Sequence, residues 1–164
     1  MMDDRISELL RIIRDEINIY RDLIEHARRK TALLVQGRVE AILESNKIDE
    51  TFNVKLRSLE AEMTRLCHDL SRSFRIPREE FTLMKLADSL EQSLAQEIRT
   101  QTTLFRNIVK QLKSVSQRNM RLIEKSVHYS RGLLALISNA TGSYRHTGLL
   151  EPIPTIQPTF SQRA

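Results

Sequence analysis

Aromatic residues, glycine, proline and cysteine are all scarce in this chain of 164 residues. Only 5% of the residues are aromatic, Trp is absent, and Gly and Pro occur four times each. Three of the prolines, Pro152, Pro154 and Pro158, lie close to the carboxyl end. A sheet needs many tight turns, so a chain this poor in turn-forming residues favours long helices. The composition therefore predicts an all-α fold.

The single cysteine, Cys67, excludes an internal disulfide and is typical of a protein in a reducing cytosol. No apolar run approaches the about 20 residues that span a bilayer. Near the start of the chain, arginines flank Ile12 and Ile13, which leaves no run as long as the apolar region of a signal peptide. We expect a soluble, cytoplasmic protein without membrane insertion.

The residues that carry catalysis or bind metals are scattered. His26, His68, His128 and His146 form no Glu-x-x-His or His-Glu-x-x-His pattern, and there is no Gly-rich phosphate loop. Cys67 and His68 are adjacent, so on a helix they point about 100° apart, a poor geometry for a nucleophile and its base. We expect no enzymatic activity, no cofactor and no metal site.

The net charge of +5 results from 26 basic and 21 acidic residues that are interleaved along the chain. Mixed signs of this kind are typical of solvated helix faces. No basic patch with interleaved aromatic residues is present, so we expect no nucleic-acid partner.

Two heptad patterns predict an antiparallel helical hairpin. The first covers residues 4–36, and Gly37 is well placed to end it. The second begins near Arg38 and ends before Pro77, because proline lacks a backbone N–H. Its seam weakens over residues 45–49, where we expect looser packing. The seam of the first helix is formed by Leu10, Ile13, Ile17, Tyr20, Ile24, Ala27, Thr31 and Leu34.

A third, longer pattern extends from residue 87 to residue 140 without an interrupting proline. Residues 81–87 form either a short separate turn or the start of this helix. The predicted architecture is a long hairpin plus a long third helix, a coiled-coil-like three-helix bundle. Residues 1–140 would form one helical domain, and residues 141–164 a flexible tail that contains the three prolines.

Beyond residue 118 the third helix carries two apolar stripes that are offset by one residue. Together they make an apolar face wider than one coiled-coil seam. One interpretation is a helix buried on two sides, by its own hairpin and by the tail or a dimer mate. The other is a surface that accepts an amphipathic helix of a partner. The stripes consist of Asn119, Leu122, Ser126, Tyr129, Leu133 and Leu136, and of Met120, Ile123, Val127, Ser130, Leu134 and Ile137.

Several segments, taken in order, resemble the FlgN-type flagellar export chaperones. The first hairpin is similar at residues 20–24 (YRDLI) and 31–38 (TALLVQGR), and the second helix at residues 56–66. The strongest similarity is Asn-Met-Arg-Leu-Ile with the following Val and Leu-Leu, within residues 119–134. A Tyr-x-x-x-Gly pattern follows at residues 144–148. The tail beyond residue 148 matches no pattern of the family.

The resemblance implies a cytosolic chaperone that holds the two hook–filament junction proteins before type III secretion. It implies that the carboxyl-terminal helical region covers the amphipathic terminal helices of these clients, without ATP. Tyr144 becomes a candidate contact to the export gate or to components of the ATPase complex. The candidate client-binding residues are Asn119, Met120, Leu122, Ile123, Val127, Leu133, Leu134 and Ile137.

Two alternatives remain open at the level of the sequence. In the first, the chain is a structural or adaptor coiled-coil protein whose wide apolar face is a homodimer interface. In the second, it is a basic helical module that binds nucleic acid or an anionic membrane surface. A further hypothesis is that residues 149–164 cover the apolar face when no client is bound.

Overall fold

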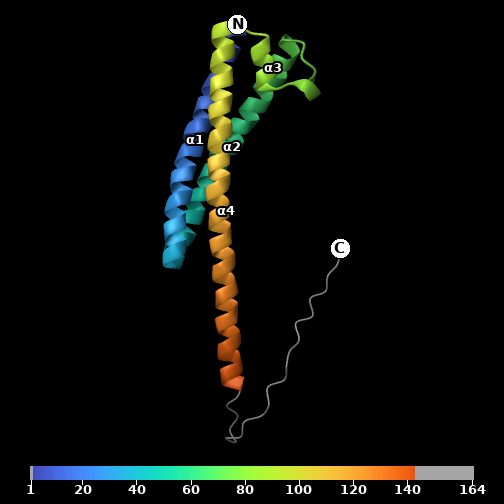
Figure 1. Ribbon diagram of the computed structural model, residues 1–164. Coiled ribbons are helices and arrows are strands. Elements are labelled where there is room, and N and C mark those ends of the chain that lie inside the picture. Colours follow the sequence, from blue (N-terminus) through green and yellow to red (C-terminus); the bar gives the residue numbers. More distant parts are fainter. Residues whose placement is uncertain (1, 143–164) are drawn as a thin grey trace, which may run out of the picture. The chain divides into compact units, whose positions relative to one another are not determined.

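The computed structural model describes residues 2–142, with side chains from residue 4 to residue 138. These residues are mostly helical, with no strand among them. The long helices are α1 (Met2–Gln36), α2 (Val39–Ser73) and α4 (Gln92–Gly142). A 3-10 turn, η1 (Arg78–Glu80), and a short helix, α3 (Leu83–Asp88), connect α2 to α4 (Figure 1). The predicted all-α fold is confirmed. The chain divides into two units, residues 1–122 and 123–164, and α4 belongs to both.

The turn between α1 and α2 follows from one glycine. Gly37 has a φ of 65°, a conformation that costs glycine no steric strain. Its N–H donates to Leu34 O at 3.3 Å, and the N–H of Arg38 donates to Leu33 O at 3.1 Å. These two bonds are a Schellman motif, which satisfies the last carbonyls of α1. The chain reverses at once, and α1 and α2 lie antiparallel as predicted (Figure 1).

The end of α2 has the same hydrogen-bond pattern without a glycine. Arg75 has a φ of 54°, and the N–H of Ile76 donates to Ser71 O at 3.0 Å. The hydroxyl of Ser71 returns a hydrogen bond to Ile76 O at 2.8 Å. Pro77 follows and prevents further helix. The left-handed residue here is one that nothing in the sequence pattern marked.

The segment before α4 is a separate helix, which answers the question that the sequence left open. Thr82 caps α3 because its Oγ1 accepts a hydrogen bond from the backbone N–H of Lys85 at 3.1 Å. Leu86 and Ala87 on this helix are buried in the core. The three long helices are therefore accompanied by α3 and η1, in agreement with the alternative of a separate element before the third helix.

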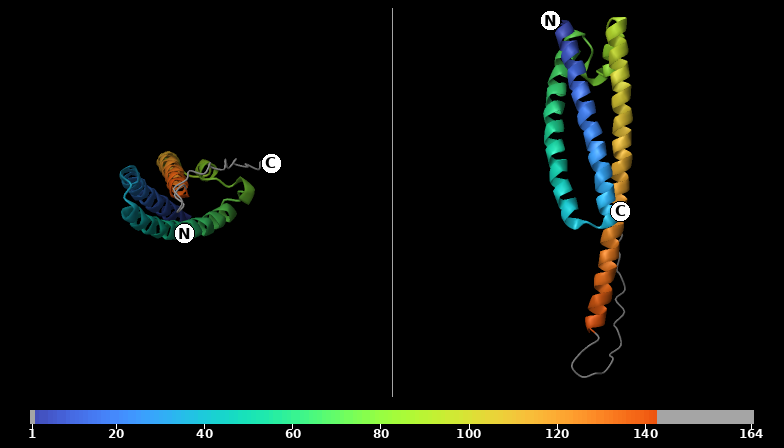
Figure 2. Two further views of the ribbon diagram at one scale, coloured as in Figure 1. Left: turned by 90° about the horizontal axis from the view of Figure 1, so that it is seen from below. Right: turned by 90° about the vertical axis from the view of Figure 1, so that its left-hand side faces the viewer.

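Within residues 1–122, α1 lies between α2 and the first part of α4 in the right-hand view of Figure 2. The seam predicted for α1 is buried or half-buried along its whole length. Ile6, Leu9 and Ile12 are also fully buried, so α1 has a second apolar stripe because it packs against two neighbours. Tyr20 packs edge-on against Phe105 of α4, with ring centroids 5.3 Å apart.

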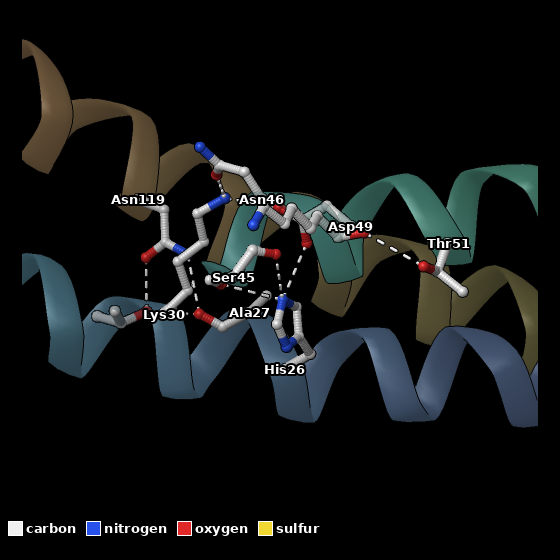
Figure 3. A network of polar contacts seen from close by, with 10 residues as sticks. His26, Ala27, Lys30, Ser45, Asn46, Asp49, Thr51 and Asn119 are labelled. Atoms are coloured by element: carbon white, nitrogen blue, oxygen red, sulfur yellow. Dashed lines mark hydrogen bonds and ion pairs between the residues drawn. The ribbon is translucent and has the colours of Figure 1, made fainter. Parts of the chain in front are cut away.

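Residues 45–49, where looser packing was expected, contribute to a polar cluster with α1, while Asn46, Lys47 and Ile48 of this stretch are exposed. Ser45 is only 4% exposed, and its hydroxyl lies 3.0 Å from Nε2 of His26 (Figure 3). The same imidazole nitrogen lies 3.1 Å from a carboxylate oxygen of Asp49. Lys30 donates to Asp49 and to Asn46, at 2.6 Å each. Apolar residues are missing from this part of the seam because a polar cluster takes their place between α1 and α2.

Candidate functional site

One buried amide links α4 to α1 within their shared apolar core. Asn119 is 6% exposed, and its Nδ2 donates to the backbone carbonyl of Ala27 at 2.9 Å (Figure 3). Its Oδ1 accepts a hydrogen bond from the hydroxyl of Thr31 at 2.6 Å. A polar residue in an apolar seam fixes the register of two helices, because a shift along the axis leaves its buried polar atoms without partners. Asn119 therefore fixes where α4 lies on α1.

The surroundings of α4 change after Leu122. Leu122 is half-buried, whereas every described side chain from Ile123 to Ser138 is exposed. This holds for both stripes that the sequence predicted. Large apolar side chains with exposed fractions between 38% and 68% are Ile123, Val127, Tyr129, Leu133, Leu134, Leu136 and Ile137.

The exposed side chains make one continuous surface, which we call the apolar face of α4. At about 3.6 residues per turn, the two stripes cover an arc of roughly 160° around the helix axis. From Ile123 to Ile137 the face is about 21 Å long, because a helix rises about 1.5 Å per residue. On soluble proteins in general, large exposed apolar surfaces often mark interaction sites, which makes this face the candidate site.

The structure places the eight candidate client-binding residues in three environments. Leu122 is half-buried, and Asn119 is buried with its amide bonded to α1. The buried hydrogen bonds of Asn119 were not anticipated, since a seam position alone does not say which carbonyl a neighbour brings. Tyr144 lies outside the described residues. The six exposed candidates are Met120, Ile123, Val127, Leu133, Leu134 and Ile137.

Neither metal binding nor thiol chemistry has a site in the part of the chain that the structure describes. There, no three His, Cys, Asp or Glu side chains gather as metal ligands would. Burial, assisted by the negative charge of Glu16, raises the pKa of the Cys67 thiol to about 11. Since the thiolate is the reactive form, the half-buried Cys67 should react more slowly than a free thiol at neutral pH. Among residues 2–142 no helix has the length and apolar character of a membrane span.

Positive charge is concentrated on α4. Between residues 98 and 142 the chain has eight Lys and Arg residues but one acidic residue, Glu124, whereas the whole chain has a net charge of +5. Arg99 pairs with Asp88 of α3 at 2.6 Å. The other seven make no ion pair with any described residue; they are Arg106, Lys110, Lys113, Arg118, Arg121, Lys125 and Arg131.

The described residues are mostly helical, and α4 presents an exposed apolar face of the kind that accepts a partner helix. The model of the FlgN protein family matches residues 1–152, and the chain belongs to this family. Family membership gives it the general role of a flagellar export chaperone and confirms the resemblance seen in the sequence. The FlgN family is a chaperone family that is not known for enzymes. No curated protein and no solved structure matches the chain.

Proposed function

We propose that this chain is a cytoplasmic chaperone of flagellar type III secretion. Its clients are the hook–filament junction proteins, whose amphipathic terminal helices it binds and protects before export. The observation that supports this role most directly is the apolar face of α4, whose described side chains from Ile123 to Ile137 are exposed. The family match supports the chaperone role in general, and the identity of the client is our proposal.

The mechanism is the packing of a client helix against this face. Ile123, Val127 and Leu134 lie on one stripe at spacings of four and seven residues, which is the spacing that knobs-into-holes packing uses. Each Leu or Ile that becomes fully buried contributes about 1.5–3 kcal/mol of transfer free energy. Part of this gain offsets the entropy lost on association. The client helix is thereby kept from premature assembly without any need for ATP.

A pair of substitutions separates the interface from the core. Ile123→Asp places a carboxylate on the apolar face, where water still reaches it in the free protein. We expect binding of a hook–filament junction protein to be lost while the melting temperature changes by less than about 2 °C, since exposed substitutions cost within about 0.5 kcal/mol. Ile98→Asp is the contrasting variant, because Ile98 is fully buried and an unpaired carboxylate there should unfold the protein.

A matched control tests whether any exposed Asp weakens binding. Val54 of α2 is 68% exposed, and Val54→Asp should leave both stability and client binding unchanged. Calorimetric titration with the client and thermal denaturation followed by circular dichroism give the two readouts. A melting temperature that collapses for Ile123→Asp would place this stripe in a core and count against the proposed site. Self-association through the face would appear as a dimer mass that Ile123→Asp converts to a monomer.

A further inference from the structure

The charges that border the apolar face of α4 are mainly positive. Arg118 and Lys125 are seven residues apart, so they recur at one heptad position, beside the stripe that contains Leu122 and Leu133. Arg131 borders the opposite stripe, as does the acidic Glu124 at the same heptad position. The three basic border residues are exposed, and none is in an ion pair with a described residue. Their positive charge is therefore available to a partner that lies on the face.

A second copy of the chain fits this surface poorly. At the borders of its apolar face, α4 has the basic Arg118, Lys125 and Arg131 and one acidic residue, Glu124. Two α4 helices packed through the same face would bring these mainly like charges together, and like charges across an interface oppose association. A partner with acidic borders has the opposite effect, because each basic border residue of α4 gains a counterion at the rim.

The apolar stripes also indicate what kind of surface the partner presents. The stripe through Leu122, Leu133 and Leu136 continues, at heptad spacing, the seam through which α4 packs on α1 at Asn119. Heptad spacing serves packing against another helix, whereas a membrane surface requires an apolar side but no register. The continuity of the seam therefore favours a helix over an anionic lipid surface.

We infer that the helix accepted by the apolar face of α4 is one whose own apolar stripe is bordered by Asp or Glu at heptad spacing. This inference rests on the proposed chaperone function and names the chemistry of its client segment. Arg118 and Lys125 pair with one acidic border of the client helix, and Arg131 pairs with the other. Burial of the apolar stripes supplies the affinity, and the charges at the rim select the helix and its orientation.

The experiment uses the full chain and two synthetic amphipathic peptides. Both peptides carry the same Leu heptad stripe, and their border positions are Glu in one and Lys in the other. At about 0.1 M salt we expect the Glu-bordered peptide to bind about 10-fold more tightly or better. At about 1 M salt the Debye length falls from about 10 Å to about 3 Å, so the preference should largely disappear.

Two triple variants with equal net charge locate the effect. The border variant combines Arg118→Glu, Lys125→Glu and Arg131→Glu, and it should lose or reverse the preference for the Glu-bordered peptide. The control variant combines Arg21→Glu, Arg28→Glu and Arg57→Glu, which are exposed positions on α1 and α2 without a described ion pair. It should keep the preference. If the border variant does not fold, the corresponding Gln substitutions replace it, and they should weaken the preference.

Other results overturn the inference in distinguishable ways. If both peptides bind with equal affinity and Ile123→Asp abolishes this binding, the face is an apolar client site without charge selection. The inference then fails, and the proposed function stands. Loss of the preference in the control variant would mean that only net charge acts. Binding to phosphatidylglycerol vesicles in place of the peptides would assign the face to a membrane. If neither peptide binds, the inference fails, and a parallel titration with a hook–filament junction protein decides the proposed function separately.

Discussion

Replacing Asn119 by Asp changes one donor into an acceptor without changing the size of the side chain. In the protein, Nδ2 of Asn119 donates to the carbonyl of Ala27 at 2.9 Å, in a position that is 6% exposed. After Asn119→Asp, two acceptors face each other at that distance, and a carboxylate lies in the seam between α1 and α4. The hydroxyl of Thr31 still donates to the other oxygen.

The expected cost follows from these atoms. A buried group that loses its hydrogen-bond partner costs about 1–3 kcal/mol, and more when it is charged. We expect Asn119→Asp to reduce the free energy of unfolding by about 2–4 kcal/mol. For a chain of this length that lowers the melting temperature by about 5–15 °C. Burial raises the pKa of the introduced carboxyl, so the deficit should be present at neutral pH and shrink below about pH 4, where the group is protonated in both states.

A contrasting variant tests the reasoning. In Asn119→Leu the carbonyl of Ala27 and the hydroxyl of Thr31 can satisfy each other, because they are already within 3.0 Å. We therefore expect a change in stability within about 1 kcal/mol, since replacing a hydrogen-bonding side chain by an apolar one can be neutral when no buried partner is left unpaired. Thermal and urea denaturation at several pH values measure both variants. If Asn119→Asp melts within about 2 °C of the native protein, the amide does not hold α4 on α1.

Three further predictions concern single residues of α1, α2 and the turns. Burial, and to a smaller extent the negative charge of Glu60, raises the pKa of Glu16, so the ionised Glu16 lowers the stability of the fold above the ordinary pKa of 4.5. Glu16→Gln should therefore raise the melting temperature at neutral pH, and this gain should vanish in acid. Gly37→Ala should cost about 1 kcal/mol in urea denaturation because of its φ of 65°, whereas Arg75→Gly should stabilise by about 0.5–1 kcal/mol by relieving a φ of 54°. Cys67 should be alkylated slowly until the pH approaches about 11 and at the rate of a free thiol in denaturant; fast alkylation of the folded protein would contradict its burial.

Turn chemistry shows where sequence reasoning reaches its limit. The end of α1 before Gly37 was predictable, because glycine is the most common residue in the left-handed position that follows a helix. The end of α2 was also predicted, from Pro77, but the left-handed conformation of Arg75 was not. Hydrogen bonds of Ser71 and Ile76 hold this unfavourable conformation, and the residue type gives no sign of it. The same limit applies to Ser45, because the pattern of α2 does not contain the position of His26 on α1, whose Nε2 lies beside the Ser45 hydroxyl.

The sequence by itself determined the helical fold, the hairpin, the two stripes of α4 and the family, because periodicity is a property of each helix alone and family patterns are local. Only the tertiary structure decided which part of each stripe is buried. Asn119 and Ile123 are four residues apart on the same helix, yet one is bonded to Ala27 and the other is exposed. Burial depends on the atoms that a second element brings to a position, and one helix's own pattern does not contain that information.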